Sequence, residues 1–326
     1  MRCYVVGAGL LGLTSAWFLG RLGYDVSVYE SGGDVGHGTS YANGGMLHAS
    51  EACPWNHPGI FWEALKMLGK EDSALLIRPF AVVSMLPWVW SFFRNSNAKF
   101  FRSNLEKNTR MAKYSLKVLN EDLLDLKLNF SYAGLGTLKV YYSRSALLKA
   151  RVVAEKAREI GTRCTILDSR EVIELEPALA SISSSLVGGI YYPDDVSGDA
   201  YQFCKSLASR CREAGITIYE NTKVDRILTL ERKFDGLSIG GEVVRGEVCV
   251  IAAGCGSKQL LKETGIRLPV EPVKGYSITL PMSDWDRVPK IPVIDELRHA
   301  AVCPLGSKLR VAGTAEFAGY DSNMTL

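Results

Sequence analysis

The sequence of 326 residues lacks the patterns on which several common chemistries depend. Its eight cysteines never occur as C-x-x-C and its four histidines share no helical i, i+4 face, so the usual zinc motifs are missing and no metal site is expected. Neither a G-x-S-x-G turn nor a G-x-x-x-x-G-K-[ST] loop is present. Acyl transfer and P-loop phosphate chemistry therefore lack their characteristic residues.

A strong charge of either sign is also missing. The net charge is +3, and no group of lysines and arginines is interleaved with aromatic residues, so nucleic acid is not expected as a partner. Several cysteines lie inside apolar runs, which indicates free thiols in a reducing compartment and predicts a cytoplasmic protein. A chain of this length exceeds the usual size of one domain, so we expect two domains.

The most informative feature present is a glycine-rich turn near the N-terminus. Residues 2–6 predict a strand buried on both faces of a parallel sheet, and Gly7-Ala8-Gly9-Leu10-Leu11-Gly12 follows them. Gly7 permits a tight turn, Gly9 lets backbone N–H groups approach a pyrophosphate, and Gly12 lets a helix pack closely on the strand. We therefore expect Val6 and this turn to bind a dinucleotide.

The next strand supports the same interpretation. Gly23 is a plausible helix C-cap, residues 25–29 predict a second strand, and the Glu30 carboxylate at its end would accept hydrogen bonds from a ribose. The glycines alone carry little weight, because an ordinary packed turn between a strand and a helix contains similar residues. An NAD-dependent dehydrogenase would use the same first motif.

A glycine-rich stretch over residues 31–40 follows, and it predicts a loop that faces the cofactor. It leads to Asn43-Gly44-Gly45, whose paired glycines permit the backbone to lie against a ligand or a neighbouring strand. A simple Asn-Gly turn is the alternative.

Residues 60–130 predict amphipathic helices with a basic face. Within them, residues 75–93 are rich in aromatic side chains but interrupted by two prolines, so a membrane-spanning helix is not expected. We hypothesise that this segment, with Arg94, Lys99 and Arg102, contacts a membrane surface or an electron-accepting partner. Ordinary core packing is the alternative.

The second half predicts a return to the nucleotide domain. The apolar strand over residues 248–254 ends in Ala253 and Gly254, where the backbone would be uncovered beside a cofactor, and Val224 could pack on an adenine. Taken singly, such residues are more often part of a plain core. Further strands indicate an antiparallel sheet in a second domain, and they fall at residues 136–142, 188–192, 269–281, 291–294 and 309–312, with a helix over 145–160.

With these residues in place, the chain resembles the FAD-dependent D-amino acid dehydrogenase (small subunit) group of the D-amino acid oxidase-like superfamily. The first motif is shared by many nucleotide-binding proteins, whereas the later ones are far more specific. The segments that carry the resemblance are Val6 to Gly12, Thr39-Ser40-Tyr41-Ala42-Asn43-Gly44-Gly45, Pro54-Trp55-Asn56-His57-Pro58-Gly59, Glu174-Leu175-Glu176-Pro177-Ala178-Leu179, Asp195-Val196-Ser197-Gly198-Asp199 and Val273-Lys274-Gly275-Tyr276-Ser277.

The resemblance implies an α/β protein with a Rossmann-like FAD-binding domain and a second, α+β substrate domain built on an antiparallel sheet. We expect residues 1–60 and 194–265 in the first domain, and residues 61–193 and 266–326 in the second. FAD would bind noncovalently, with its pyrophosphate at the first helix, its ribose on Glu30, and its flavin ring near Ser40, Asn43, Gly44 and Gly45.

Similar enzymes move the α-hydrogen of a D-amino acid to the flavin as a hydride, and the imine hydrolyses to a 2-oxo acid and ammonia. Their electrons pass to a respiratory acceptor, a quinone or in vitro a dye, which suits a cytoplasmic protein that rests on the inner membrane. Such a transfer needs an uncharged amine and a cation for the carboxylate rather than a strong base. Tyr276 is our candidate catalytic residue, and a purely structural tyrosine is the alternative.

Members of this family continue beyond the last residues of this sequence. Their additional part carries an Arg-Pro-containing loop and a Gly-His-Gly-type segment that flank the flavin and help to hold the substrate carboxylate. This chain has no counterpart of either, which predicts weak FAD binding and slow turnover. The alternative to an active dehydrogenase is therefore an inactive fragment, or a noncatalytic nucleotide-binding remnant.

Overall fold

The computed structural model describes residues 1–70, 75–159, 161–321 and 323–324. The chain forms two compact units, each built from segments far apart in the sequence. The first unit comprises residues 1–43, 125–130 and 199–271, and the second comprises residues 44–124, 131–198 and 272–326. The two units are defined by which parts of the backbone pack together. The boundaries of the FAD-binding and substrate domains expected from the sequence stay a prediction.

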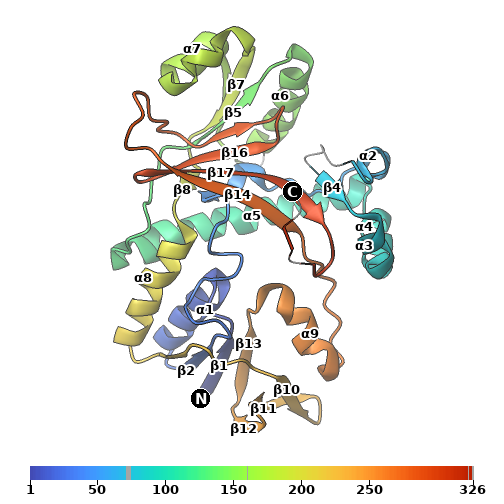
Figure 1. Cartoon of the computed structure of the whole chain (residues 1–326), viewed down its shortest axis with the longest axis vertical. Coiled ribbons are helices and arrows are strands. Elements are labelled where there is room, and N and C mark those ends of the chain that lie inside the picture. The colour runs from blue at the N-terminus through green and yellow to red at the C-terminus, as the bar shows by residue number, and fades with distance from the viewer. Residues whose placement is uncertain (71–74, 160, 322, 325–326) are drawn as a thin grey trace. The chain divides into compact units, whose positions relative to one another are not determined.

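A parallel sheet forms the centre of the first unit, with the strand order β13-β1-β2-β9 among the described residues (Figure 1). The strands of this sheet are β1 (Arg2–Val6), β2 (Asp25–Tyr29), β9 (Thr217–Tyr219) and β13 (Val248–Ile251). Cys3 and Val5 of β1 are fully buried, as expected for a central strand covered on both faces. Helices α1 (Leu10–Arg21) and α8 (Ala200–Glu213) contact each other in this unit.

A smaller antiparallel sheet belongs to the same unit. It contains β10 (Arg226–Leu230), β11 (Lys233–Ile239) and β12 (Glu242–Arg245), and helix α9 (Ser257–Leu261) follows β13. Buried side chains from both sheets form one core cluster, which includes Tyr4, Tyr29 and Leu237. This shared core joins the two sheets of the first unit.

The second unit is built on a large sheet whose order in the described part of the chain is β14-β17-β16-β15-β5-β7-β6, with β4 beside β17. The strands are β4 (Leu75–Ile77), β5 (Thr137–Tyr141), β6 (Thr165–Asp168), β7 (Gly188–Tyr192), β14 (Lys274–Pro281), β15 (Val293–Asp295), β16 (Ala300–Leu305) and β17 (Lys308–Phe317). Most neighbours are antiparallel, but β15 runs parallel to β5 and β4 runs parallel to β17. Long connections separate the members of these two pairs, so no hairpin fixes their direction.

Helices accompany this sheet. They are α2 (Ile60–Met67), α3 (Pro79–Ser84), α4 (Leu86–Arg94), α5 (Ala98–Val118), α6 (Arg144–Glu159) and α7 (Ser169–Leu175). The short strands β3 (Met46–Leu47) and β8 (Val196–Ser197) pair with each other. Segments of 3-10 or π helix occur at Ala49–Glu51, Leu119–Leu123, Leu124–Leu126, Pro177–Ser185, Gly254–Gly256 and Lys262–Thr264.

The expected helical region over residues 60–130 is wrong in one place, because Leu75–Ile77 forms β4 and pairs with β17. A short apolar run in the sequence does not distinguish a strand from a helix. Here the run forms a strand because it pairs with residues 315–317 of β17. Residues 71–74 of that region, and Ile160 at the end of the helix expected over 145–160, lie outside the described residues.

Over the ranges that the structure describes, no helix has the length and apolar character needed to cross a membrane. The same ranges hold no group of three or more histidine, cysteine, aspartate or glutamate side chains arranged to bind a metal ion.

Candidate dinucleotide and substrate site

The turn between β1 and α1 has space only for glycine at two positions. Gly7 has φ +101°, and a Cβ there would lie 2.5 Å from the carbonyl oxygen of Ala252. A Cβ on Gly12 would lie 1.8 Å from the carbonyl oxygen of Gly7. These contacts are far below van der Waals distance, so the close approach of α1 to β1 and β13 depends on both glycines.

The first turn of α1 fits an anionic ligand. Its N-cap residue, Gly9, makes no side-chain capping hydrogen bond, and no acidic residue lies in this turn. The Leu10 N–H donates to the hydroxyl oxygen of Ser40, 3.2 Å away, and Leu11 is 75% exposed. No carboxylate within this first turn neutralises the partial positive charge of the helix N-terminus, which suits a pyrophosphate. Ser40 lies at this end of the cradle.

Glu30 has a structural role that the sequence did not reveal. One of its carboxylate oxygens accepts a hydrogen bond from the Ala8 N–H, and the other accepts one from the Gly32 N–H, each at 2.8 Å. The carboxylate therefore ties the glycine turn to the loop after β2. The Ser31 hydroxyl also donates to this carboxylate at 3.3 Å. A carboxylate has about four acceptor positions, so about one remains for a ribose hydroxyl.

The loop over residues 31–40 folds back onto the glycine turn. The Gly36 N–H donates to the carbonyl oxygen of Ala8 at 2.9 Å, and a Cβ on Gly36 would lie 2.9 Å from the Cβ of Cys204. The Asn221 N–H donates to the carbonyl oxygen of Gly32 at 2.8 Å. Asn221 was missed from the sequence, since it follows β9 and only strand pairing brings it to this loop.

The other expected cofactor residues of the first unit lie at the edge of its core. Val224 is 5% exposed and packs in the cluster that contains Tyr4 and Tyr29. Ala253 packs against that cluster, and Gly254 has φ +53° with open space where a side chain would be. Asn43 is half-buried at the end of the unit's first segment. Their contact with an adenine or a flavin stays a prediction.

Gly44 and Gly45 belong to the second unit. Gly45 has φ +71°, its carbonyl oxygen accepts the Gly198 N–H at 2.8 Å, and a Cβ on it would lie 3.3 Å from the sulfur of Cys303. A Cβ on Gly44 would lie 4.0 Å from the Cβ of Ala312. The paired glycines therefore let the backbone lie close to β16 and β17.

Tyr276 is part of a buried polar network on β14 and β17. Its hydroxyl donates to a carboxylate oxygen of Glu316 at 2.5 Å, and Glu316 is only 1% exposed. The same carboxylate forms ion pairs with Arg78 at 2.7 Å and with Lys274 at 3.2 Å. Glu316 and Arg78 were not expected, because no local pattern marks two residues so far apart in the sequence.

A bulge in the pairing of β14 with β17 affects the direction of the Tyr276 side chain. The register between β14 and β17 shifts between Gly275 and Tyr276, and Thr314 on β17 has φ +52°. Gly313 stands directly opposite Tyr276, so no side chain crowds the ring from that position. Bulges next to functional sites commonly redirect side chains in this way.

His48 and Asp195 are two further polar residues of the second unit. The Asp195 carboxylate accepts a hydrogen bond from the Ser50 hydroxyl at 2.5 Å, and burial raises its pKa. The Nδ1 atom of His48 has no hydrogen-bond partner among the described residues. Burial, with a smaller contribution from the positive charge of Lys139, lowers the pKa of His48 to about 4. His48 is therefore neutral at pH 7.

This shift predicts a loss of stability in mild acid. The unfolded chain binds a proton on His48 near pH 6.5, whereas the folded chain resists it until about pH 4. The stabilisation is complete above pH 6.5 and is lost as the pH falls toward 4. Between pH 7 and 4.5 the wild type should lose about 2–3 kcal/mol more unfolding free energy than His48→Gln, measured by urea titration. Parallel pH profiles for the two proteins would contradict this.

The parallel sheet, the glycine turn and the acidic residue after β2 are the arrangement expected of a dinucleotide-binding protein. The family described as FAD dependent oxidoreductase matches residues 2–326, and the chain belongs to this family. FAD is therefore its cofactor, and the first turn of α1 with the Glu30 carboxylate suits that group. The alternative of an NAD-dependent dehydrogenase is wrong, because the family uses FAD. The expected α/β fold class with an FAD-binding domain is confirmed.

The chain is similar to curated relatives named D-amino acid dehydrogenase. It is 36% identical over 323 residues to that of Paramagnetospirillum magneticum, covering 98% of this chain and 76% of the relative. It is 33% identical over 321 residues to that of Vibrio vulnificus strain CMCP6, covering 98% of this chain and 77% of the relative.

Solved structures share the fold. Glycine oxidase from Geobacillus kaustophilus aligns with a TM-score of 0.71 at 21% identity, over 100% of this chain and 74% of that one. L-proline dehydrogenase from P. horikoshii also aligns with a TM-score of 0.71, at 17% identity, over 100% of this chain and 73% of that one. At these identities the likeness concerns the fold.

Proposed function

We propose that this protein oxidises D-amino acids to 2-oxo acids and ammonia and passes the electrons to a respiratory acceptor, a quinone or in vitro a dye. The main support for this proposal is that nearly the whole chain matches relatives named D-amino acid dehydrogenase. The chain also has the glycine turn before α1 and the Glu30 carboxylate beside it. Bound FAD would supply the acceptor for the substrate's α-hydrogen as a hydride.

The residues of the chain would bind and orient the two reactants. The turn at Gly7 to Gly12 and the Ser40 hydroxyl would hold the pyrophosphate, and Glu30 would hold the ribose. Asn43, Gly44 and Gly45 would lie beside the flavin, with Val224, Ala253 and Gly254 toward the adenosine side. These assignments follow the positions described above and remain proposals.

Tyr276 would position the substrate amine. Its single hydroxyl proton points to Glu316, so the phenolic oxygen presents lone pairs and would accept a hydrogen bond rather than donate one. Such an oxygen suits the N–H of an uncharged amine better than it suits a carboxylate. Holding the amine in one orientation favours transfer of the neighbouring α-hydrogen.

A spectroscopic and kinetic experiment tests the function. With FAD supplied, anaerobic D-alanine should bleach the flavin absorbance and support reduction of a dye, whereas L-alanine should do neither. Tyr276→Phe should retain FAD and lower kcat/KM for D-alanine roughly 10–100-fold, a loss of about 1.4–2.8 kcal/mol of transition-state stabilisation.

Two outcomes would overturn the proposal. Bound flavin that no D-amino acid bleaches would favour the noncatalytic nucleotide-binding alternative. Unchanged kinetics of Tyr276→Phe would assign that residue a structural role only.

A further inference from the structure

Residues 79–93 contain no charged side chain, yet much of this segment is exposed. It folds into α3 and α4, which follow each other with only Met85 between them. From residue 75 to residue 105 the charged side chains are Arg78, Arg94, Lys99 and Arg102, all of them basic. Along the chain the charged residues nearest this helical pair, Arg78 and Arg94, are both basic, while α2 carries the exposed Glu63 and Lys66.

The two helices have an inner and an outer face. Ala81 and Met85 on the inner face are 1% and 3% exposed. The outer face carries large apolar side chains at intervals of three or four residues, and their exposed fractions are 62% for Phe80, 68% for Val83, 53% for Leu86 and 73% for Trp90. A helix that is apolar on all sides normally has apolar surroundings on all sides. The outer face therefore indicates a second apolar environment.

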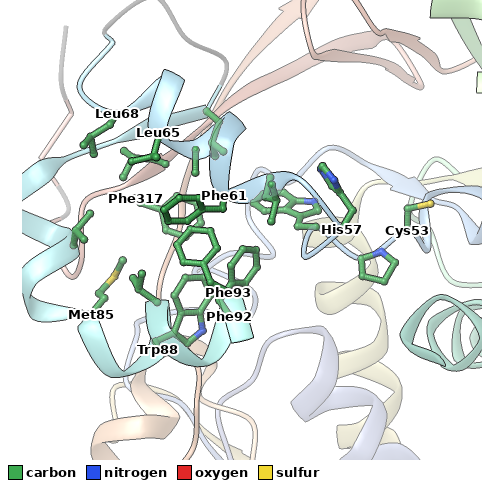
Figure 2. Close-up of a pocket in the computed structure, with 18 of the residues that line it drawn as sticks. Cys53, His57, Phe61, Leu65, Leu68, Met85, Trp88, Phe92, Phe93 and Phe317 are labelled. Atoms are coloured by element: carbon green, nitrogen blue, oxygen red, sulfur yellow. The ribbon is translucent and has the colours of Figure 1, made fainter. Parts of the chain in front are cut away.

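The inner face borders a cavity of about 540 Å³, lined largely by aromatic and aliphatic side chains from α2, α3, α4 and β4. Glu51 and His57 also line it. Figure 2 shows Phe61, Trp88, Phe92 and Phe93 gathered in this cavity, with Leu65 and Leu68 of the α2 region above them. In α2, Trp62 does not line the cavity and is 67% exposed.

The basic side chains lie immediately beside the apolar stripe. Arg94 is the last residue of α4, and Lys99 and Arg102 lie in the first two turns of α5. The Asn97 side chain accepts the Phe100 N–H at 3.2 Å, which fixes the tight turn between the two helices. All three basic side chains are exposed. Positive charge next to exposed tryptophan and aliphatic side chains matches the headgroup region of an anionic bilayer.

We propose that α2, α3 and α4 dock on the surface of an anionic lipid bilayer. The outer face of α3 and α4, together with Trp62, enters the boundary between headgroups and acyl chains, and the three basic side chains bind lipid phosphates. The uncharged segment is too short to cross a bilayer, so the contact is peripheral. This surface goes beyond the proposed oxidation and does not depend on it.

Flotation with lipid vesicles tests the proposal on the full chain with FAD supplied. The protein should float with vesicles of phosphatidylcholine and phosphatidylglycerol, and much less with phosphatidylcholine alone or at high salt. Phe80→Glu combined with Trp90→Glu should lower the partition coefficient at least about a hundredfold, because two large buried side chains are lost from the apolar phase. Changing Arg94, Lys99 and Arg102 together to glutamine should lower it roughly a hundredfold.

Leu148→Glu is the matched control. Leu148 is apolar and 61% exposed on α6, so its substitution should leave flotation unchanged. Circular dichroism of every variant establishes that the fold is retained. The proposal would be overturned by a wild type that does not float, by equal flotation of all variants, or by self-association that Trp90→Glu abolishes without any vesicle binding. Dye reduction is measured separately, so failure of the proposed oxidation is distinguishable.

Discussion

Gly12→Ala is expected to abolish useful FAD binding and to destabilise the first unit by about 3 kcal/mol or more. The added Cβ would lie 1.8 Å from the carbonyl oxygen and 2.9 Å from the carbonyl carbon of Gly7. Both are backbone atoms, so no side chain can rotate away, and α1 must move off β1. The amides at the start of α1 then leave the position that a pyrophosphate requires.

Two measurements check this expectation. FAD affinity, measured by quenching of flavin fluorescence, should fall at least a hundredfold, and urea unfolding should give the stability loss. Leu22→Ala is the control, because Leu22 is 75% exposed at the C-terminal end of α1, away from the glycine turn. Equal affinity and stability for Gly12→Ala and the wild type would show that α1 does not pack on the turn as described.

Glu316→Ala is expected to lower the unfolding free energy by about 3–5 kcal/mol. Its carboxylate is 1% exposed and pairs with Arg78 and Lys274, whose side chains are 16% and 19% exposed. Removing the carboxylate takes the ion-pair partner from two largely buried cations, of which Lys274 keeps its hydrogen bond to the Asn323 carbonyl oxygen. It also removes the Glu316 acceptor of the Tyr276 hydroxyl. The cost therefore exceeds that of losing a pair in solvent.

The comparison with an exposed pair makes this prediction specific. Glu174 pairs with Arg170 on α7 with side chains 62% and 86% exposed, so Glu174→Ala should cost less than about 1 kcal/mol. Glu316→Gln should fall between the two, because its amide oxygen can still accept from Tyr276. Thermal and urea unfolding of the three variants test the order. Similar losses for Glu316→Ala and Glu174→Ala would refute the buried network.

Local sequence patterns predicted the glycine turn between β1 and α1. The turn from Gly7 to Gly12 and the position of Gly23, just after the C-cap residue Leu22, depend on backbone conformations within a few residues. Gly23 has φ +84° and its N–H donates to Gly20, as a helix terminator should. Such features are set by sterics that any neighbouring fold must respect.

Contacts between distant segments could not be predicted in the same way. Glu30 was expected to bind a ribose, but its bonds to the Ala8 and Gly32 amides appear only when the loop folds back. The strand at Leu75–Ile77 forms because it can pair with the edge of β17, which lies far away in the sequence. Strand propensity alone does not contain that information.

The sequence by itself determined the glycine turn, the alternation of strand and helix around it, and the uncharged character of residues 79–93. These depend on the spacing of glycines, apolar residues and charges along the chain. Only the tertiary structure decided that Glu316 gathers Arg78, Lys274 and Tyr276, and that the outer face of α3 and α4 is exposed. The physical reason is that burial and ion pairing are properties of neighbours in space, which chain order does not fix.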